Sequence, residues 1–158
     1  MNGHVYQVDG ELGKRPNQFK KTTKQVWQIV MREWDSPHLF ETILRDRKPP
    51  DLKEPEYPGD EAPKNRIFKW EYDMKRYMKT KYQYEDSLFS LWSLIDNQGS
   101  ALAQTGVKAV KDYSTAYKTK DCCWLLDTYE KVTSKVFSNQ HFAAAVIQAR
   151  KNLYSYCQ

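Results

Sequence analysis

The chain has 158 residues, of which 40 % are hydrophobic and 28 % are charged, and its formal net charge is +5. This length fits one domain with one core, and the composition excludes an intrinsically disordered chain. The start lacks the pattern of a signal peptide and no apolar run reaches membrane-spanning length, so we expect a cytoplasmic protein with reduced thiols and no membrane contact.

The first predicted helix begins near Pro16, which suits a first-turn position. Residues 1–15 contain three glycines and little periodicity, and we expect them to form an N-terminal arm. The sequence Ser36-Pro37 ends the first helix, and a short helix is expected over residues 38–46. The apolar stripe of the first helix has helical spacing and consists of Phe19, Val26, Val30 and Trp34.

Residues 47–63 hold five of the seven prolines, which predicts an extended Pro-rich loop inside the domain. A long helix is then expected from Asp60 or Glu61. A separate helix with Asp86 as its N-cap should follow and should stop near Gly99. The expected inward residues of the long helix are Ile67, Trp70, Met74, Tyr77 and Met78.

Three further helices are expected: a weaker one over residues 100–113, one capped by Thr119 or Asp121, and one over residues 138–157. The predicted fold class is therefore all-α, a compact bundle of about six to seven helices within residues 16–158. The last helix is still amphipathic where the sequence stops. We therefore expect this domain to be the N-terminal lobe of a longer polyprotein.

The adjacent thiols of Cys122 and Cys123 are predicted to belong to the core, not to a metal site or a nucleophile. Neighbouring residues on a helix point about 100° apart, and no Cys or His lies at the spacing that a zinc site requires. His141 stands alone on the next predicted helix, without the orienting group that a Cys-His nucleophile needs. Apolar residues follow in the same predicted helix, so at least one of the two thiols is expected to lie in the core.

The sequence predicts no enzyme, no catalytic residue and no cofactor. Phosphate-binding glycine patterns and a nucleophile elbow do not occur. The carboxylate pairs on Lys-rich helices are expected to be solvated, with partners such as Lys131 four residues after Asp127.

Basic residues are concentrated near the first helix, where residues 14–32 include no acid. The predicted RNA contacts are Lys14, Arg15, Lys20, Lys21 and Lys24. Contacts of this kind bind phosphates without reading base sequence, so RNA binding should be weak and sensitive to salt. A second basic stretch runs from Lys64 to Lys81, with seven basic residues against two acidic ones. The alternative is that both stretches serve solubility alone.

The order of segments resembles the N-terminal capsid-like part of Gag polyproteins from copia-type LTR retrotransposons. The motif residues are Trp70 and Tyr77, then Leu91, Trp92, Ile95 and Gln98, then Asp121, Cys122, Trp124, Leu125 and Leu126, and finally Arg150, Tyr154, Tyr156 and Gln158. Two features depart from that family: residues 97–100 read Asn-Gln-Gly-Ser where the family often has Gly-Gln-Cys-Ser, and neither a second lobe nor a zinc knuckle is present.

The resemblance implies a helical capsid lobe that joins other copies of itself into a particle shell around RNA, with aromatic side chains among the contacts. Trp27 and Trp34 lie seven residues apart on one face of the first helix and are the predicted assembly contacts. The alternative function is a monomeric helical module that binds a peptide or RNA, such as a domesticated Gag.

Overall fold

The computed structural model describes residues 5–8 and 15–134, and its regular structure is helical apart from one isolated bridge. The helices of this part are α1 (Arg15–Glu33), α2 (His38–Asp46), α3 (Lys64–Asp96), α4 (Ala101–Lys108), α5 (Tyr113–Thr119) and α6 (Cys122–Thr133). The all-α prediction is confirmed. The helix predicted over residues 138–157 lies outside the described residues.

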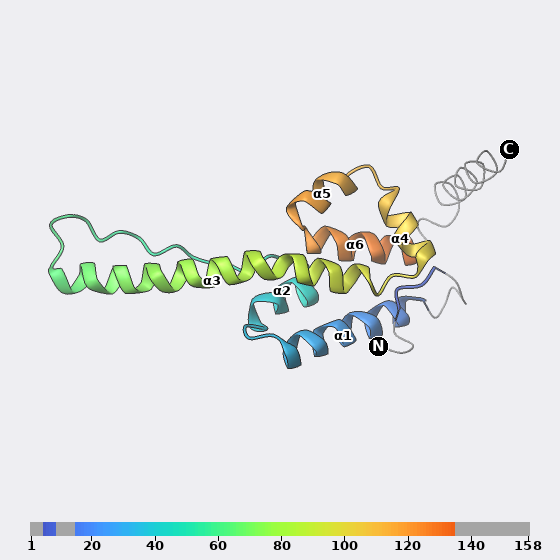
Figure 1. Ribbon diagram of the computed structural model, residues 1–158, viewed down its shortest axis with the longest axis horizontal. Coiled ribbons are helices and arrows are strands. Elements are labelled where there is room, and N and C mark those ends of the chain that lie inside the picture. The colour runs from blue at the N-terminus through green and yellow to red at the C-terminus, as the bar shows by residue number, and fades with distance from the viewer. Residues whose placement is uncertain (1–4, 9–14, 135–158) are drawn as a thin grey trace.

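Helix α6 lies at the centre of the bundle and contacts each of the other five helices (Figure 1). The carboxylate of Asp121 accepts a hydrogen bond from the Trp124 peptide N–H at 2.9 Å, so Asp121 is the predicted N-cap of this helix. The buried apolar residues of α6 are Cys122, Leu125, Leu126, Tyr129 and Val132. They face the inward residues of α3, which include Leu91 and Ile95.

Tyr6 anchors the N-terminal segment to the bundle, because its peptide N–H donates to the Gln98 carbonyl at 2.7 Å and its carbonyl accepts from Ser100 at 2.9 Å. The ring is fully buried and lies 5.0 Å from the ring of Tyr129 and 5.1 Å from that of Phe19. Within the predicted N-terminal arm, Tyr6 is therefore a core residue.

Helix α3 is one continuous helix of 33 residues, and the prediction of two helices separated near Asp86 is wrong. Residues 80–86 contain neither Gly nor Pro, so nothing in the backbone ends the helix there. The helix also begins at Lys64 and not at Asp60 or Glu61. Gly59 has a left-handed φ of 92°, and Pro63 disfavours helix at the residue before it.

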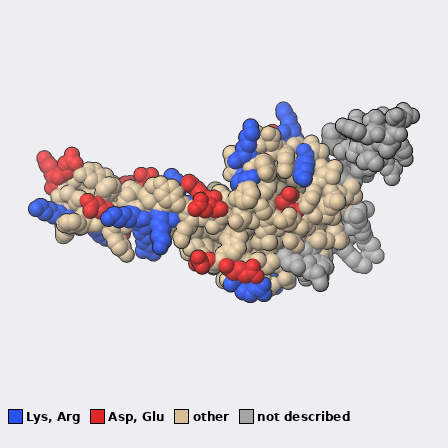
Figure 2. Space-filling view, in the orientation of Figure 1, with Lys and Arg blue, Asp and Glu red and all other residues tan. Residues whose placement is uncertain are grey.

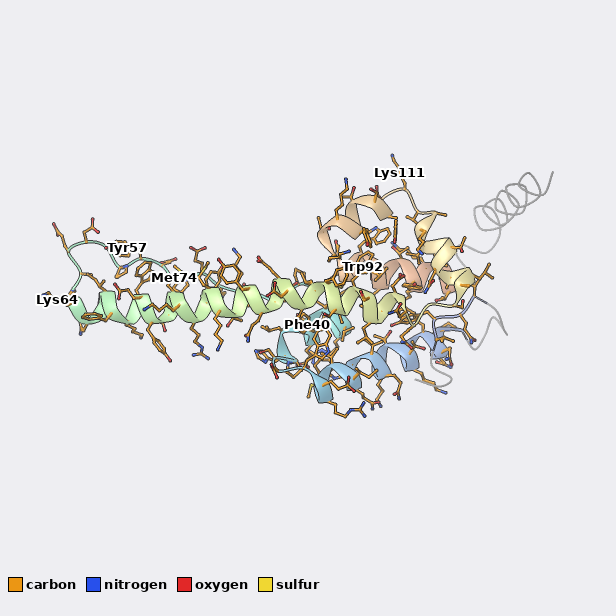
Figure 3. The ribbon with its side chains drawn as sticks, in the orientation of Figure 1. Phe40, Tyr57, Lys64, Met74, Trp92 and Lys111 are labelled. Carbon is orange, nitrogen blue, oxygen red and sulfur yellow. The ribbon has the colours of Figure 1, made fainter. Side chains whose placement is uncertain are left out.

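The N-terminal half of α3 projects from the bundle, and the Pro-rich segment that precedes it in the chain lies alongside this half (Figure 1). We call residues 51–63 the strap, and the strap together with residues 64–82 of α3 the arm. The Trp70 indole N–H donates to the Pro55 carbonyl at 3.1 Å, and the Tyr57 ring lies 4.9 Å from that of Trp70. Met74 and Tyr57 lie on the facing sides of α3 and the strap (Figure 3).

The residues predicted to face inward on the first half of α3 are only partly buried, and none belongs to the core. The reason is that a single extended strap covers this half, where other helices cover the second half. No residue from 45 to 90 is buried, so Leu44 and Leu91 are consecutive core residues along the sequence.

The weak helix predicted over residues 100–113 is present but shorter, as α4, and the short helix α5 that begins at Tyr113 was not predicted. Helix α4 has a side-chain cap, since the Ser100 hydroxyl accepts from the Ala103 peptide N–H at 3.3 Å. A turn over residues 109–112 follows, and Lys120 ends α5 with a left-handed φ of 53°.

Candidate interaction surfaces

The two thiols differ in exposure, and the predicted core role is confirmed for Cys122. Its side chain is buried and its thiol contacts the Leu88 carbonyl of α3 at 3.7 Å. Burial raises the pKa of the Cys122 thiol, and the pKa of half-buried Cys123 is raised to about 11, first by burial and then by Asp121 and Asp127. A nucleophilic or metal-binding cysteine requires the thiolate, which this environment disfavours.

Two of the predicted RNA-contact residues line one side of a groove of about 430 Å³ between α1 and α2. Lys20, Lys24 and Trp27 line it together with Phe19 of the core and Arg47. Lys21 is exposed on the same helix, Arg15 begins α1, and Lys14 lies outside the described residues. The structure thus brings Lys20 and Lys24 together with one of the predicted assembly contacts.

Most charges around this groove are already neutralised within the domain. Arg45 pairs with Glu41 at 2.8 Å, and Arg47 lies 3.3 Å from Asp127 and 3.8 Å from Glu130. The prediction that Asp127 pairs with Lys131 is wrong, because Arg47 occupies the space between α2 and α6. Lys20 and Lys24 are the cations of this groove that form no ion pair within the described residues.

Trp27 and Trp34 are both partly buried and pack against the core. The ring of Trp34 meets that of Phe40 edge to face at 5.0 Å, so it fixes the corner between α1 and α2. Trp27 lies at the margin of the inward stripe, as expected from its place one residue after Val26. Each ring therefore has a structural role and only part of its surface is free.

The arm carries a second surface, on the side of α3 away from the strap. Phe68 and Tyr72 are each 68 % exposed, and Tyr82 is 56 % exposed. Together with Lys75 and Lys79 they follow a spacing of four, three, four and three residues, which places all five on one face of the helix. We call this surface, with the adjacent Arg76, the helix face of the arm.

Charge divides the arm into two opposite edges. The strap carries five acidic residues and one lysine, whereas residues 64–81 carry seven basic and two acidic residues. Figure 2 shows Lys and Arg gathered along the edge of the arm away from the strap, with Asp and Glu at its tip and on the strap edge. Within the described residues, no ion pair joins the strap to α3.

The helix face of the arm was not among the predicted sites. The signal was present, because a second set of aromatic positions recurs at helical spacing about 200° from Trp70 around the helix. The apolar stripe on the strap side has the same helical spacing and gives the stronger pattern, because it contains Ile67, Met74 and Met78.

No group of three or more His, Cys, Asp or Glu side chains that could hold a metal ion occurs in residues 5–8 and 15–134. Over the same residues, no helix has both the length and the apolar character to cross a bilayer. Neither a family model, nor a curated protein, nor a solved structure matches the chain.

Proposed function

We propose that the chain is a Gag-like capsid domain that assembles with copies of itself around RNA. The observation that carries the proposal is the arm, which projects from the bundle and presents exposed aromatic side chains of Phe68, Tyr72 and Tyr82. Large exposed apolar side chains on one face are typical of protein interaction surfaces. The resemblance of the segment order to copia-type Gag supports assembly over other kinds of interaction.

The core supports this proposal indirectly. Within the described residues, all buried side chains lie before residue 45 or after residue 90, and Leu52 is the residue of the arm that packs against the core, so the arm contributes little to it. An element of more than thirty residues that the core does not require is best explained by a contact outside the domain. RNA would be held weakly by unpaired lysines such as Lys20 and Lys24, because few phosphates are neutralised.

A second function has its own observation in the groove between α1 and α2. An aromatic side chain, Trp27, lies there beside the unpaired Lys20 and Lys24. This combination suits a monomeric module that binds an acidic peptide or a single RNA strand.

The test is light scattering of the purified chain over rising concentration, with and without single-stranded RNA, on three proteins. The parent chain should increase in mass with concentration. Substituting Phe68, Tyr72 and Tyr82 by Ser should abolish that increase and leave the helical circular dichroism unchanged. The groove variant Trp27→Ala separates a contact through the arm from the contact through α1 that the sequence predicted: if the arm carries the contact, this variant should assemble like the parent.

Each other outcome has a definite meaning. A parent chain that stays monomeric at every concentration contradicts the proposal and favours the binding module. Loss of assembly in Trp27→Ala alone would move the contact from the arm to α1, where the sequence predicted it.

A further inference from the structure

The two edges of the arm carry opposite charges and, apart from the pair of Asp51 with Lys53, these charges form no ion pair within the part of the chain that the structure describes. Glu54, Glu56 and Glu61 are exposed on the strap and belong to none of the ion pairs of the described residues. Lys75, Arg76 and Lys79 are likewise exposed and unpaired on the helix side. The acidic set of one copy is therefore complementary in charge to the basic set of a second copy.

We propose that the arm is a self-complementary docking element, in which the acidic strap of one copy lies on the basic and aromatic helix face of the next. This inference rests on the proposed self-assembly and names the surfaces that carry it. The aromatic rings of Phe68, Tyr72 and Tyr82 would be covered by the partner's strap, while its carboxylates meet the lysines between them. Electrostatic complementarity of this kind fixes orientation and register.

Two other occupants fit the arm less well. Pairing helix face against helix face would bring the Lys75 and Lys79 side chains of both copies together, and like charges in an interface oppose binding. A single RNA strand would match the lysines and aromatic rings but would leave the acidic strap unmatched and near phosphates. Only the strap of another copy satisfies both charge sets at once.

The geometry makes this contact open-ended. Because the strap and the helix face lie on opposite sides of α3, an arm that has docked through one side keeps the other side free. Such a heterologous contact produces rings or continuing assemblies, not closed dimers. Residues 64–82 span only about 28 Å, so a single contact is small and assembly depends on its repetition.

The experiment reverses each charge set separately and then both together. The helix variant carries Lys75→Glu, Arg76→Glu and Lys79→Glu, and the strap variant carries Glu54→Lys, Glu56→Lys and Glu61→Lys. The combined variant carries all six changes and has the same net charge as the parent. A control with the same charge change as the helix variant carries Lys108→Glu, Lys111→Glu and Lys118→Glu, which are exposed residues of α4, of α5 and of the turn between them, outside the arm.

Association is measured by light scattering at about 0.1 M salt, where charges interact over roughly 10 Å. The helix variant and the strap variant should each require at least about tenfold higher concentration to associate than the parent. The combined variant should associate like the parent, as should the control. At about 1 M salt the parent, the combined variant and the control should associate less, since screening then shortens the attraction to roughly 3 Å.

Circular dichroism and the Trp70 indole N–H resonance report whether the bundle and the docked strap survive each change. Failure of the combined variant to recover association in a folded protein would overturn the inference, as would single-set variants that associate like the parent. A parent chain that never associates would instead overturn the proposed function, and this inference with it.

A labelled 20-nucleotide oligouridine identifies the competing occupant. If the strap variant binds it more tightly than the parent, the helix variant loses binding and the combined variant fails to associate, the helix face binds RNA and the inference is wrong. Unchanged oligouridine binding across the arm variants, together with recovery in the combined variant, supports docking between copies.

Discussion

The phenol of Tyr6 is held in an environment that resists its ionisation. Burial raises the pKa of Tyr6 to about 12, while the hydrogen bond with Thr23 and the charge of Arg47 oppose the shift. An unfolded tyrosine has a pKa of about 10. The stability contributed by this group is therefore complete below pH 10 and is lost as the pH rises toward 12, because only the unfolded state releases the proton there.

We expect the free energy of unfolding to fall more steeply with alkaline pH in the wild type than in Tyr6→Phe. The difference between the two proteins should change by about 2 to 3 kcal/mol between pH 10 and pH 12. Urea unfolding followed by circular dichroism at several pH values measures it. Equal pH dependence in both proteins would show that Tyr6 ionises freely in the folded state.

The second residue-scale prediction concerns the thiols, in a chain that carries Cys157→Ser so that only the described cysteines react. With the pKa of Cys123 raised to about 11, little thiolate exists at pH 8, and Cys122 is buried. A thiol-specific reagent should therefore react roughly a hundredfold or more slowly with the native protein than with the protein in urea. Rapid native labelling at Cys123 would contradict this picture.

Among the elements, α1, α2 and α6 are joined through one side chain. Arg47 follows α2 in a left-handed conformation with a φ of 57° and donates to the Leu44 carbonyl at 2.8 Å. Its guanidinium lies 5.5 Å from the ring centroid of Phe19 and forms ion pairs with Asp127 and Glu130 of α6. The pair with Asp127 is close at 3.3 Å, yet Nε is not aligned to donate a hydrogen bond.

Replacing Arg47 with Met should lower the free energy of unfolding by about 1 to 3 kcal/mol, because the ion pairs and the cation–π contact are lost from a largely buried side chain. Arg47→Lys keeps the charge and should cost less. Thermal unfolding of the two variants gives the comparison. Equal losses in both would show that the guanidinium geometry, and not the positive charge alone, makes this contribution.

Sequence patterns predicted the elements well where apolar spacing and local caps agree. The stripe of α1, the break at Ser36-Pro37 and the Asp121 cap depend on nearby residues, which is why they were predictable. The continuity of α3 was not, because Asp86 suits both a cap and an exposed helical position. The strap was also missed as a packing partner, since its contact with Trp70 joins residues fifteen apart through a backbone carbonyl.

The candidate surfaces were predictable to a smaller extent. Arg45 and Arg47 pair with the acidic side chains near the groove, which leaves Lys20 and Lys24 without an ion pair there. The pair of Arg47 with Asp127 forms because α2 packs on α6, and the sequence does not reveal that packing. The ring of Trp34, a predicted assembly contact, packs against Phe40, and no local sequence pattern predicts this contact. Assembly through Trp27 or Trp34 remains a prediction, and the Trp27→Ala variant distinguishes it from assembly through the arm.

For the whole molecule, no residue between 45 and 90 is buried, so the residues that stabilise the fold and the residues proposed to bind another copy belong to different parts of the chain. Replacing residues 53–76 with a short Gly-Ser linker should leave a bundle that unfolds cooperatively, because every buried residue is retained. The midpoint of thermal unfolding should change by only a few degrees, while association is lost. Calorimetry and light scattering measure the two properties on one sample.

A truncated bundle that fails to fold would show that the arm stabilises the core. A truncated bundle that folds and associates like the parent would place the contact on the bundle surface.

Helix α3 also joins the arm to the bundle without a hinge, since it contains neither Gly nor Pro over its whole length of about 50 Å. The angle between arm and bundle is therefore fixed by an unbroken ladder of backbone hydrogen bonds. In a chain of copies joined arm to arm, every bundle would be tilted from its neighbour by the same amount. A fixed tilt between identical units gives a surface of constant curvature, so this one helix would determine the radius of the particle.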